Sequence, residues 1–530
     1  MPDRHDRSPR ELLDDVLEEK RNVSDEGRPE SVDSQHSRGA LTARERIKYL
    51  CDDNTFFEIG KLAAPSPTTP EVYDWTREDA PADGMVTGVG KVLGRSVAIV
   101  APDYTVKGGS LGRTADKKTS RTLELALRRG IPVVMLQEGS GRRIQEGLDA
   151  RAFTQGDQDT LKHLSRLSGW VPLVGAMMGQ GFGGPTNAAV MCDFIPMVED
   201  QSTMGIAGPT LVEAALGRDI SKQELGGPQI HVDESGIADV ACEDERATLD
   251  TIKLFLSYFP KNASTSPPTE DSYTDPSRSV REQLLDIVPT DPNKAYDMYT
   301  VIEGLVDKGS TFELKSTYAK NIITTLARMG GRPVGILANN PQVMAGTIDV
   351  DAAVKASHFV SLCDAFHIPL VFLCDIPGTL PGPESEKEGL AKYGGKVVFE
   401  LNRATVPKIS VGIRRAYGLG QYVMALGDWT DTDLTVVWPT AEISAMGIEG
   451  AVDIAYHHQV EQADDPEAER EALIEKFTER SGALRAAEGM GIDEVIDPRE
   501  TRKWILHALE LGQDVEHGTW PPKKHGINPI

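Results

Sequence analysis

Short apolar runs alternate with longer amphipathic segments along the chain. Pro132–Leu136 and Leu370–Leu373 are short and wholly apolar, which is typical of strands buried on both faces. Ser120–Arg129 and Ala353–Phe366 carry apolar residues at helical spacing, which predicts helices packed by one face. This alternation predicts an α/β fold with a mainly parallel sheet covered by helices. In such sheets, ligands bind where strands end in turns and helices begin.

The same order of elements runs through the chain twice. Matching short strings recur in one fixed order, at separations of 235 to 255 residues. The matched strings begin at Thr55 and Ser310, Val89 and Leu326, Gly130 and His367, Gly139 and Pro377, Val171 and Val406, Phe182 and Tyr417, and Met204 and Met446. One short match arises easily by chance, but a full ordered set predicts a duplicated domain.

Segments without periodicity divide the chain. Residues 261–282 are polar and rich in Pro and Ser at their start, so they are predicted to link residues 41–260 to residues 283–530. Residues 1–40 are predicted to form a helical appendage, because Ser8 and Glu11 can form a capping box around Pro9. The apolar stripe of this helix indicates packing or docking.

Composition excludes several classes of protein. The 530 residues include 56 Lys or Arg and 81 Asp or Glu, and a formal charge of −25 argues against nucleic acid as a partner. No window is apolar enough for a membrane span, and the charged N-terminus lacks the apolar core of a secretory signal. The five Cys show no metal-ligand or disulfide spacing, so we expect a reducing, cytoplasmic setting and no bound metal.

Three glycine-rich stretches could hold an anion with backbone N–H groups, although each could also be a plain tight turn. Lys107–Gly112 is the first, and the cations that follow it could meet phosphates or form a solvated helix face: Arg113, Lys117 and Lys118. Gly179–Asn187 places consecutive glycines before a helix, where unpaired N–H groups stabilise a negative oxygen. Ala416–Gly420 takes the equivalent place in the second repeat.

The sequence offers no side-chain nucleophile. It contains no G-x-S-x-G, no paired Cys and His, no H-E-x-x-H and no Walker loop. Glu138 and Asp375 occupy related strand ends, and we interpret them as turn or cap residues rather than catalysts. Two anion cradles without an obvious base predict an enzyme whose reagent supplies the basic atom.

An ordered set of motifs carries a family resemblance from about Leu41 to the C-terminus. KGGSLG at 107–112 resembles FGGSLG, EGSGRRIQEG at 138–147 resembles DSGGARIQEG, and LGGPQIHVDESG at 225–236 resembles LGG..TH...SG. The second half adds NNP at 339–341, FVSLCDAF at 359–366, DIPGTLP at 375–381, RRAYG at 414–418, WPTA at 438–441 and PPKKHG at 521–526. The chain thus resembles the carboxyltransferase (β) subunits of biotin-dependent acyl-CoA carboxylases, those of propionyl-CoA carboxylase in particular.

The resemblance implies two tandem crotonase-type (ββα-superhelix) domains that arose by internal duplication. It implies a ligase subunit that moves a carboxyl group from carboxybiotin to the α-carbon of an acyl-CoA, propionyl-like by default, through an enolate. The coenzyme A thioester binds the N-terminal half, and carboxybiotin binds the C-terminal half of another protomer in a hexamer built as a trimer of dimers. Biotin is carried by a separate α subunit with biotin carboxylase and carboxyl carrier domains.

The resemblance also implies roles for individual residues. Gly183 and Gly184 would stabilise the thioester enolate, and Leu419 and Gly420 would hold the ureido oxygen of biotin. The substrate-binding residues would be Gly109, Ser110, Leu111, Gly141, Arg142 and Tyr422.

The chain departs from the family pattern in places. Ser140 and Arg142 replace Gly and Ala, which predicts a changed pocket there. Tyr422 replaces the usual Asp, and it either lines a pocket for a branched or longer acyl chain, as in methylcrotonyl-CoA carboxylases, or fills space. A transcarboxylase or decarboxylase α subunit and a non-catalytic scaffold remain alternatives, whereas the duplication disfavours a single-domain hydratase.

Overall fold

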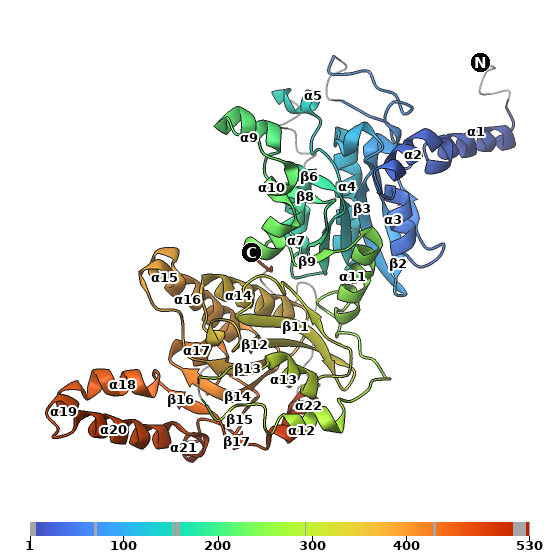
Figure 1. Ribbon diagram of the computed structural model, residues 1–530. Coiled ribbons are helices and arrows are strands. Elements are labelled where there is room, and N and C mark those ends of the chain that lie inside the picture. The colour runs from blue at the N-terminus through green and yellow to red at the C-terminus, as the bar shows by residue number, and fades with distance from the viewer. Residues whose placement is uncertain are drawn as a thin grey trace. The chain divides into compact units, whose positions relative to one another are not determined.

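The computed structural model describes residues 7–67, 71–150, 154, 159–291, 293–427, 431–511 and 526–528. The chain forms two compact units, Met1–Thr265 with Thr519–Pro529 and Ser266–Gly518 (Figure 1). Both units place helices on a mixed sheet, so the predicted α/β class is confirmed. The division between Thr265 and Ser266 falls inside the predicted linker, and the predicted domain boundaries stay predictions. Residues 521–525 of the PPKKHG motif lie outside the described residues.

The first unit is built on a seven-stranded sheet in the order β1-β2-β3-β4-β5-β7-β9. Strands β1 to β3 pair antiparallel, and the pairs from β3 to β9 are parallel. The short strands β6 and β8 pair in parallel outside this sheet. The bounds are β1 Phe57–Ile59, β2 Met85–Val92, β3 Arg95–Pro102, β4 Val133–Gln137, β5 Leu173–Met177, β6 Gln180–Phe182, β7 Pro196–Val198, β8 Thr203–Gly205 and β9 Val240–Cys242.

Helices of the first unit follow the glycine turns. The predicted capping box of Ser8 and Glu11 is present at the start of α1, and α4 ends at Gly130 in the left-handed conformation. Phe194, Phe255 and Phe259 stack in the core beneath the last helix. The bounds are α1 Pro9–Asn22, α2 Pro29–Ser37, α3 Ala43–Leu50, α4 Arg113–Arg129, α5 Ile144–Gly147, α7 Thr160–Leu167, α8 Gly184–Ala189, α9 Pro209–Leu216, α10 Lys222–Gly226 and α11 Glu245–Tyr258.

The second unit repeats this sheet in the order β10-β11-β12-β13-β14-β15-β17, with β16 paired to β14. Its strands are β10 Phe312–Glu313, β11 Ile322–Met329, β12 Arg332–Asn339, β13 Leu370–Ile376, β14 Lys408–Tyr417, β15 Leu434–Val437, β16 Glu442–Ser444 and β17 Glu494–Val495. Its main helices are α12 Arg278–Gln283, α13 Met298–Leu305, α14 Val350–Ala365, α15 Pro383–Glu388, α16 Leu390–Arg403, α17 Leu419–Val423 and α22 Thr501–Leu511. Helices α18 Ile448–Ala455, α19 His457–Glu461, α20 Pro466–Ser481 and α21 Ala483–Glu488 form an arm that projects from this sheet (Figure 1).

Strand register supports the duplication and corrects one of the matches. Phe57 pairs with Val89 as Phe312 pairs with Leu326, in agreement with the sequence match. However, Phe182 pairs with Gly205, and its equivalent Tyr417 pairs with Ser444. Gly205 is therefore equivalent to Ser444 and not to Gly447, so the match between the Met204 and Met446 strings was wrong by three residues. The chance recurrence of Met-Gly-Ile produced that error.

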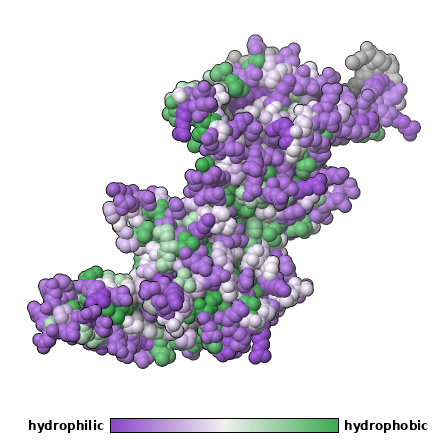
Figure 2. All heavy atoms as spheres, in the orientation of Figure 1, coloured by the Kyte–Doolittle hydropathy of each residue, from purple (hydrophilic) through white to green (hydrophobic). Residues whose placement is uncertain are grey.

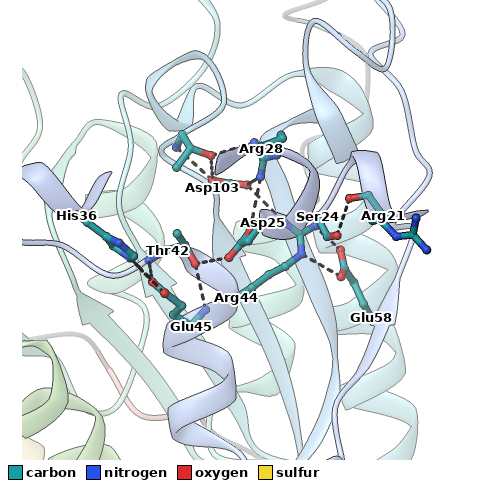
Figure 3. Close-up of polar contacts among 11 residues, drawn as sticks. Arg21, Ser24, Asp25, Arg28, His36, Thr42, Arg44, Glu45, Glu58 and Asp103 are labelled. Carbon is teal, nitrogen blue, oxygen red and sulfur yellow. Dashed lines mark hydrogen bonds and ion pairs between the residues drawn. The ribbon is translucent and has the colours of Figure 1, made fainter. Parts of the chain in front are cut away.

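The N-terminal helices are fixed to the first sheet by ion pairs. Arg28 Nη2 lies 2.8 Å from Asp103 at the end of β3, and Arg44 Nη2 lies 2.8 Å from Glu58 of β1 (Figure 3). Arg44 also lies 3.3 Å from Asp25, which bridges toward Thr42 at the start of α3. The appendage is thus held by a charge network rather than by its apolar stripe, because no residue of α1 is buried.

The outer surface is mostly polar. Figure 2 shows hydrophilic residues over most of the visible face, as the excess of acidic residues leads one to expect. Among the helices of the described residues, none is long and apolar enough to cross a membrane.

Candidate functional site

Three glycine turns of the first unit come together at the ends of strands β3, β4 and β5. Leu111 N–H donates to Gly141 O at 2.7 Å, and Arg143 N–H donates to Leu111 O at 3.0 Å. Gly139 N–H donates to Gln180 O at 2.6 Å, which joins the second turn to the third. A Cβ on Gly109 would lie 2.6 Å from a neighbouring backbone oxygen, so this approach requires glycine. Half-buried Ser110 lies in the same turn.

The turn before α8 exposes a backbone N–H group. Gly183 has φ 76° and ψ −116°, a conformation that a side chain disfavours, and its N–H donates to Gly205 O at 2.8 Å. Gly184 begins α8 and is exposed, and its N–H makes no hydrogen bond among the described residues. A Cβ on buried Gly141 would lie 3.4 Å from that nitrogen. The Gly184 N–H therefore lies beside Gly141 and is available to donate a hydrogen bond to an anionic oxygen.

The second unit repeats this turn before α17. Gly418 has φ 56° and ψ −136°, and its N–H donates to Ser444 O at 3.0 Å. Strand register makes Gly418 equivalent to Gly183, and Leu419 equivalent to Gly184. This equivalence agrees with the sequence match that begins at Phe182 and Tyr417. A Cβ on Gly420 would lie 2.8 Å from Ile376 Cδ1, so this glycine is required by packing.

A cavity of about 270 Å³ adjoins the turn before α8. Gly184, Leu111 and Arg142 line it, together with residues of β2, β3, β4, α4, α7 and α8. Arg142 Nη1 lies 2.8 Å from Asp116 Oδ2, and Nη2 lies 3.7 Å from buried Glu146. Burial raises the pKa of Asp116 to about 6. Because Asp116 and Glu146 offset its charge, Arg142 is accommodated in a turn where the resemblance leads one to expect a small residue.

The three predicted phosphate ligands differ in exposure. Arg113 is half-buried and Lys117 is exposed at the start of α4. Lys118 is buried, and its ammonium donates to Ala82 O at 3.1 Å and also to Met85 O. Burial lowers the pKa of Lys118 to about 8. This placement argues against the phosphate role predicted for Lys118, because its donors already satisfy backbone carbonyls.

The strand-end carboxylates are buried in ion pairs. Glu138 Oε2 lies 2.6 Å from Arg46 Nη1, and each Asp375 oxygen lies 2.9 Å from an arginine of β14, Arg414 or Arg415. Neither carboxylate is exposed, so the geometry agrees with the structural interpretation of both.

The predicted site residues therefore form two separate groups. Gly109, Ser110, Leu111, Gly141, Arg142, Gly183 and Gly184 surround one turn cluster in the first unit. Leu419, Gly420 and half-buried Tyr422 share α17 in the second unit. The sequence analysis missed two residues of the cavity lining, Asp116 and Gln137. No sequence signal indicated that Asp116 pairs with Arg142, which lies 26 residues further along the chain. Among the described residues, no group of His, Cys, Asp or Glu could hold a metal ion.

Comparisons with known proteins match almost the whole chain. The carboxyl transferase domain model matches residues 34–527. The carboxyltransferase subunit of propionyl-CoA carboxylase from Haloferax mediterranei is 38% identical over 98% of this chain and 99% of its own length. The methylmalonyl-CoA carboxyltransferase 12S subunit of Propionibacterium freudenreichii subsp. shermanii is 39% identical over 97% and 96%.

Solved structures agree with the sequence matches. A crystal structure of the transcarboxylase 12S hexamer assembly, with methylmalonyl-coenzyme A bound, superposes with a TM-score of 0.89 at 37% identity over 99% of both chains. The predicted fold of two crotonase-type domains is thereby confirmed. The chain therefore belongs to the carboxyl transferase domain family, and it is an enzyme of carboxyl transfer.

Proposed function

We propose that the chain is the carboxyltransferase subunit of a biotin-dependent acyl-CoA carboxylase and acts on a short acyl-CoA. The observation that carries this proposal is the repeated turn, in which Gly183 and Gly418 share one unusual backbone conformation and each precedes a helix. A carboxyl transfer needs two anionic oxygens held at once, that of the thioester enolate and that of the ureido ring. One cradle in each repeat matches that requirement.

The residues of the first unit would activate the acyl group. The Gly184 N–H stabilises the oxygen that becomes negative when the α-carbon loses its proton. One such donor lowers the activation barrier by roughly 2.7–4 kcal/mol. Leu111 and Gly141 hold the adjacent turn in place, so that the thioester carbonyl meets a rigid donor. Arg113 and Lys117, at the start of α4, would meet the phosphates of coenzyme A.

The residues of the second unit would receive biotin. The Leu419 N–H corresponds to that of Gly184, and the Gly420 N–H adds a donor where the first repeat has Pro185. Both groups begin a helix, where the dipole favours negative charge. Biotin supplies the carboxyl group when its carrier, on a separate α subunit with a biotin carboxylase domain, is bound.

Assembly and location belong to the same proposal. We propose a hexamer built as a trimer of dimers, supported by the hexamer assembly of the transcarboxylase 12S relative. A cytoplasmic, reducing location is supported by five cysteines that are all buried and free.

Transcarboxylase activity is a second candidate, because the 12S relative matches with a TM-score of 0.89. The two functions differ in the donor of the carboxyl group, which is bicarbonate in one case and a second acyl-CoA in the other. Supplying the biotinylated carrier either with labelled bicarbonate, ATP and the biotin carboxylase, or with labelled methylmalonyl-CoA alone, separates the two functions.

The decisive experiment combines the purified chain with its biotin-bearing partner. Labelled bicarbonate and ATP are supplied with acetyl-, propionyl-, 3-methylcrotonyl- or octanoyl-CoA, and labelled product is measured. Turnover of propionyl-CoA supports the proposal. A Tyr422→Asp variant tests the pocket role of this half-buried residue, because a change in acyl preference without loss of stability requires that Tyr422 face the acyl group. Failure of every acyl-CoA with a carboxylated partner would refute the proposal.

A further inference from the structure

The cavity beside Gly184 contains a buried polar side chain with no partner. Gln137 ends β4 and is only 3% exposed, yet it lines the cavity. Across the described residues its side-chain amide makes no hydrogen bond, although its backbone carbonyl accepts one from Met178 N–H. The amide is not among the fully enclosed unpaired atoms, so it reaches the open space of the cavity, where a bound group could pair with it.

Strand periodicity fixes the direction of this side chain. Met135 and Gln137 alternate with Leu136 along β4, and both line the cavity while Leu136 does not. Met135, on the same face of the strand, is apolar, as residues that line cavities usually are. Gln137 interrupts an apolar wall with two donors and one acceptor.

Other residues of the cavity lining are also polar. Asp116 and Arg142 are the charged residues that line it, and their side chains are 13% and 17% exposed. Burying such a pair is costly, and an apolar replacement is often as stable. Asn187 of α8 adds a second amide to the lining. The remaining lining residues are largely apolar, among them Met85, Val100, Pro102, Met135 and Leu161.

The size of the cavity exceeds the need of a plain short chain. Its volume of about 270 Å³ is many times what a single water needs, so the cavity has room for more than a two-carbon chain. Gly184 belongs to the same lining, so the cavity accepts whatever is attached to the carbonyl that Gly184 binds. A propionyl group extends only two carbons beyond that carbonyl and carries no atom that could hydrogen-bond to Gln137.

We propose that this cavity takes an acyl chain that carries an oxygen substituent, a hydroxyl, keto or carboxyl group, which pairs with Gln137 and the Asp116–Arg142 wall. This inference rests on the proposed function, because it names the acyl-CoA class for the same site. A site built to hydrogen-bond a substituent discriminates against the analogue that lacks it, since its buried polar groups are then left unpaired.

The experiment compares butyryl-CoA with 3-hydroxybutyryl-CoA and succinyl-CoA, which share one chain length. Binding to the full-length chain is measured by calorimetry, and carboxylation is measured with the biotin-bearing partner. Gln137→Met removes the amide at similar length, and Leu136→Met is the control on the opposite face of β4. Thermal unfolding of both variants verifies that they fold.

The expected result is that wild type binds at least one oxygenated acyl-CoA about ten-fold more tightly than butyryl-CoA, the factor for one hydrogen bond. Gln137→Met should abolish that ratio, and Leu136→Met should preserve it. Equal binding of all three probes by wild type would overturn the inference. A uniform loss in Gln137→Met for every probe would also overturn it, because the amide would then serve the common thioester. Selective binding, with no carboxylation of these probes or of propionyl-CoA, would refute the proposed function and leave the inferred binding specificity standing.

Discussion

Replacing Gly183 by alanine tests whether the turn before α8 stabilises an oxyanion. Gly183 has φ 76° and ψ −116°, a conformation that costs a non-glycine residue about 1–3 kcal/mol. The added methyl group meets no crowding, because its nearest neighbour is Ile206 O at 3.9 Å. Backbone strain is therefore the whole perturbation, and rotation of the peptide between Gly183 and Gly184 relieves it. That rotation turns the Gly184 N–H away from the substrate oxygen.

The expected consequence is a fall in kcat with little change in KM. Loss of one oxyanion donor costs about 2.7–4 kcal/mol, which lowers kcat by roughly 10²–10³. The interaction is made mainly in the transition state, so ground-state binding of the acyl-CoA changes little. Steady-state carboxylation with the biotin-bearing partner gives both constants, and urea unfolding gives the stability loss.

Gly94→Ala is the matched control. Gly94 has φ 75° in the hairpin between β2 and β3, with nothing within 4 Å of its added Cβ. It shares the positive φ, which alanine disfavours, but has no role at the site, so the substitution should lower stability and leave kcat unchanged. If Gly183→Ala retained kcat within about two-fold of wild type, the N–H orientation would not contribute to the transition state and the reasoning would fail.

Two further predictions concern buried ionisable groups. Lys118→Met should destabilise the fold by about 1–3 kcal/mol, since it leaves the buried Met85 carbonyl without its ammonium donor and leaves the Ala82 carbonyl with the Met85 N–H alone, whereas Lys117→Gln should raise only the KM for acyl-CoA; urea unfolding and kinetics distinguish the two. Burial raises the pKa of Asp193 to about 8, so its folded-state proton stabilises the protein fully below about pH 4, and this contribution is lost as the pH rises toward 8. Asp193→Asn should flatten that slope in urea midpoints from pH 5 to 8, and an unchanged slope would contradict the raised pKa.

The duplicated sheet could be predicted because its signals are local. Uniformly apolar runs such as Pro132–Leu136 identify buried strands without knowledge of their partners, and β4 and β13 lie where expected. Register is different, because it depends on hydrogen bonds between segments distant in sequence. The string match at Met446 therefore failed, while the pairing of Tyr417 with Ser444 identified the true equivalence.

The candidate site divides in the same way. Glycines that precede a helix are visible in sequence, so Gly183 and Gly184 could be named before their geometry was known. The burial of a side chain is not visible, and Lys118 was consequently grouped with the exposed Lys117. Helical spacing puts adjacent residues on different faces, but it does not say which face meets the sheet.

The two repeats keep a buried strand-end carboxylate but neutralise it in different ways. In the second unit Asp375 is paired within the sheet, by Arg414 and Arg415 of β14. In the first unit the cation comes from outside the sheet, because Arg46 of α3 lies 2.6 Å from Glu138. The first repeat therefore depends on the segment that precedes it, whereas the second supplies its own charge.

Arg46→Met tests this dependence. Arg46 is 1% exposed and also lies 2.6 Å from Glu245, so its loss removes the buried cation that two buried carboxylates share, at a cost of about 3–5 kcal/mol. Arg38→Met is the control, since Arg38 approaches the same Glu138 at 3.5 Å from a partly exposed position and contributes about 0–1 kcal/mol. Urea unfolding should separate the two variants clearly. Equal losses would mean that Arg46 contributes no more than the exposed Arg38, and that the first repeat does not depend on α3 for its charge balance.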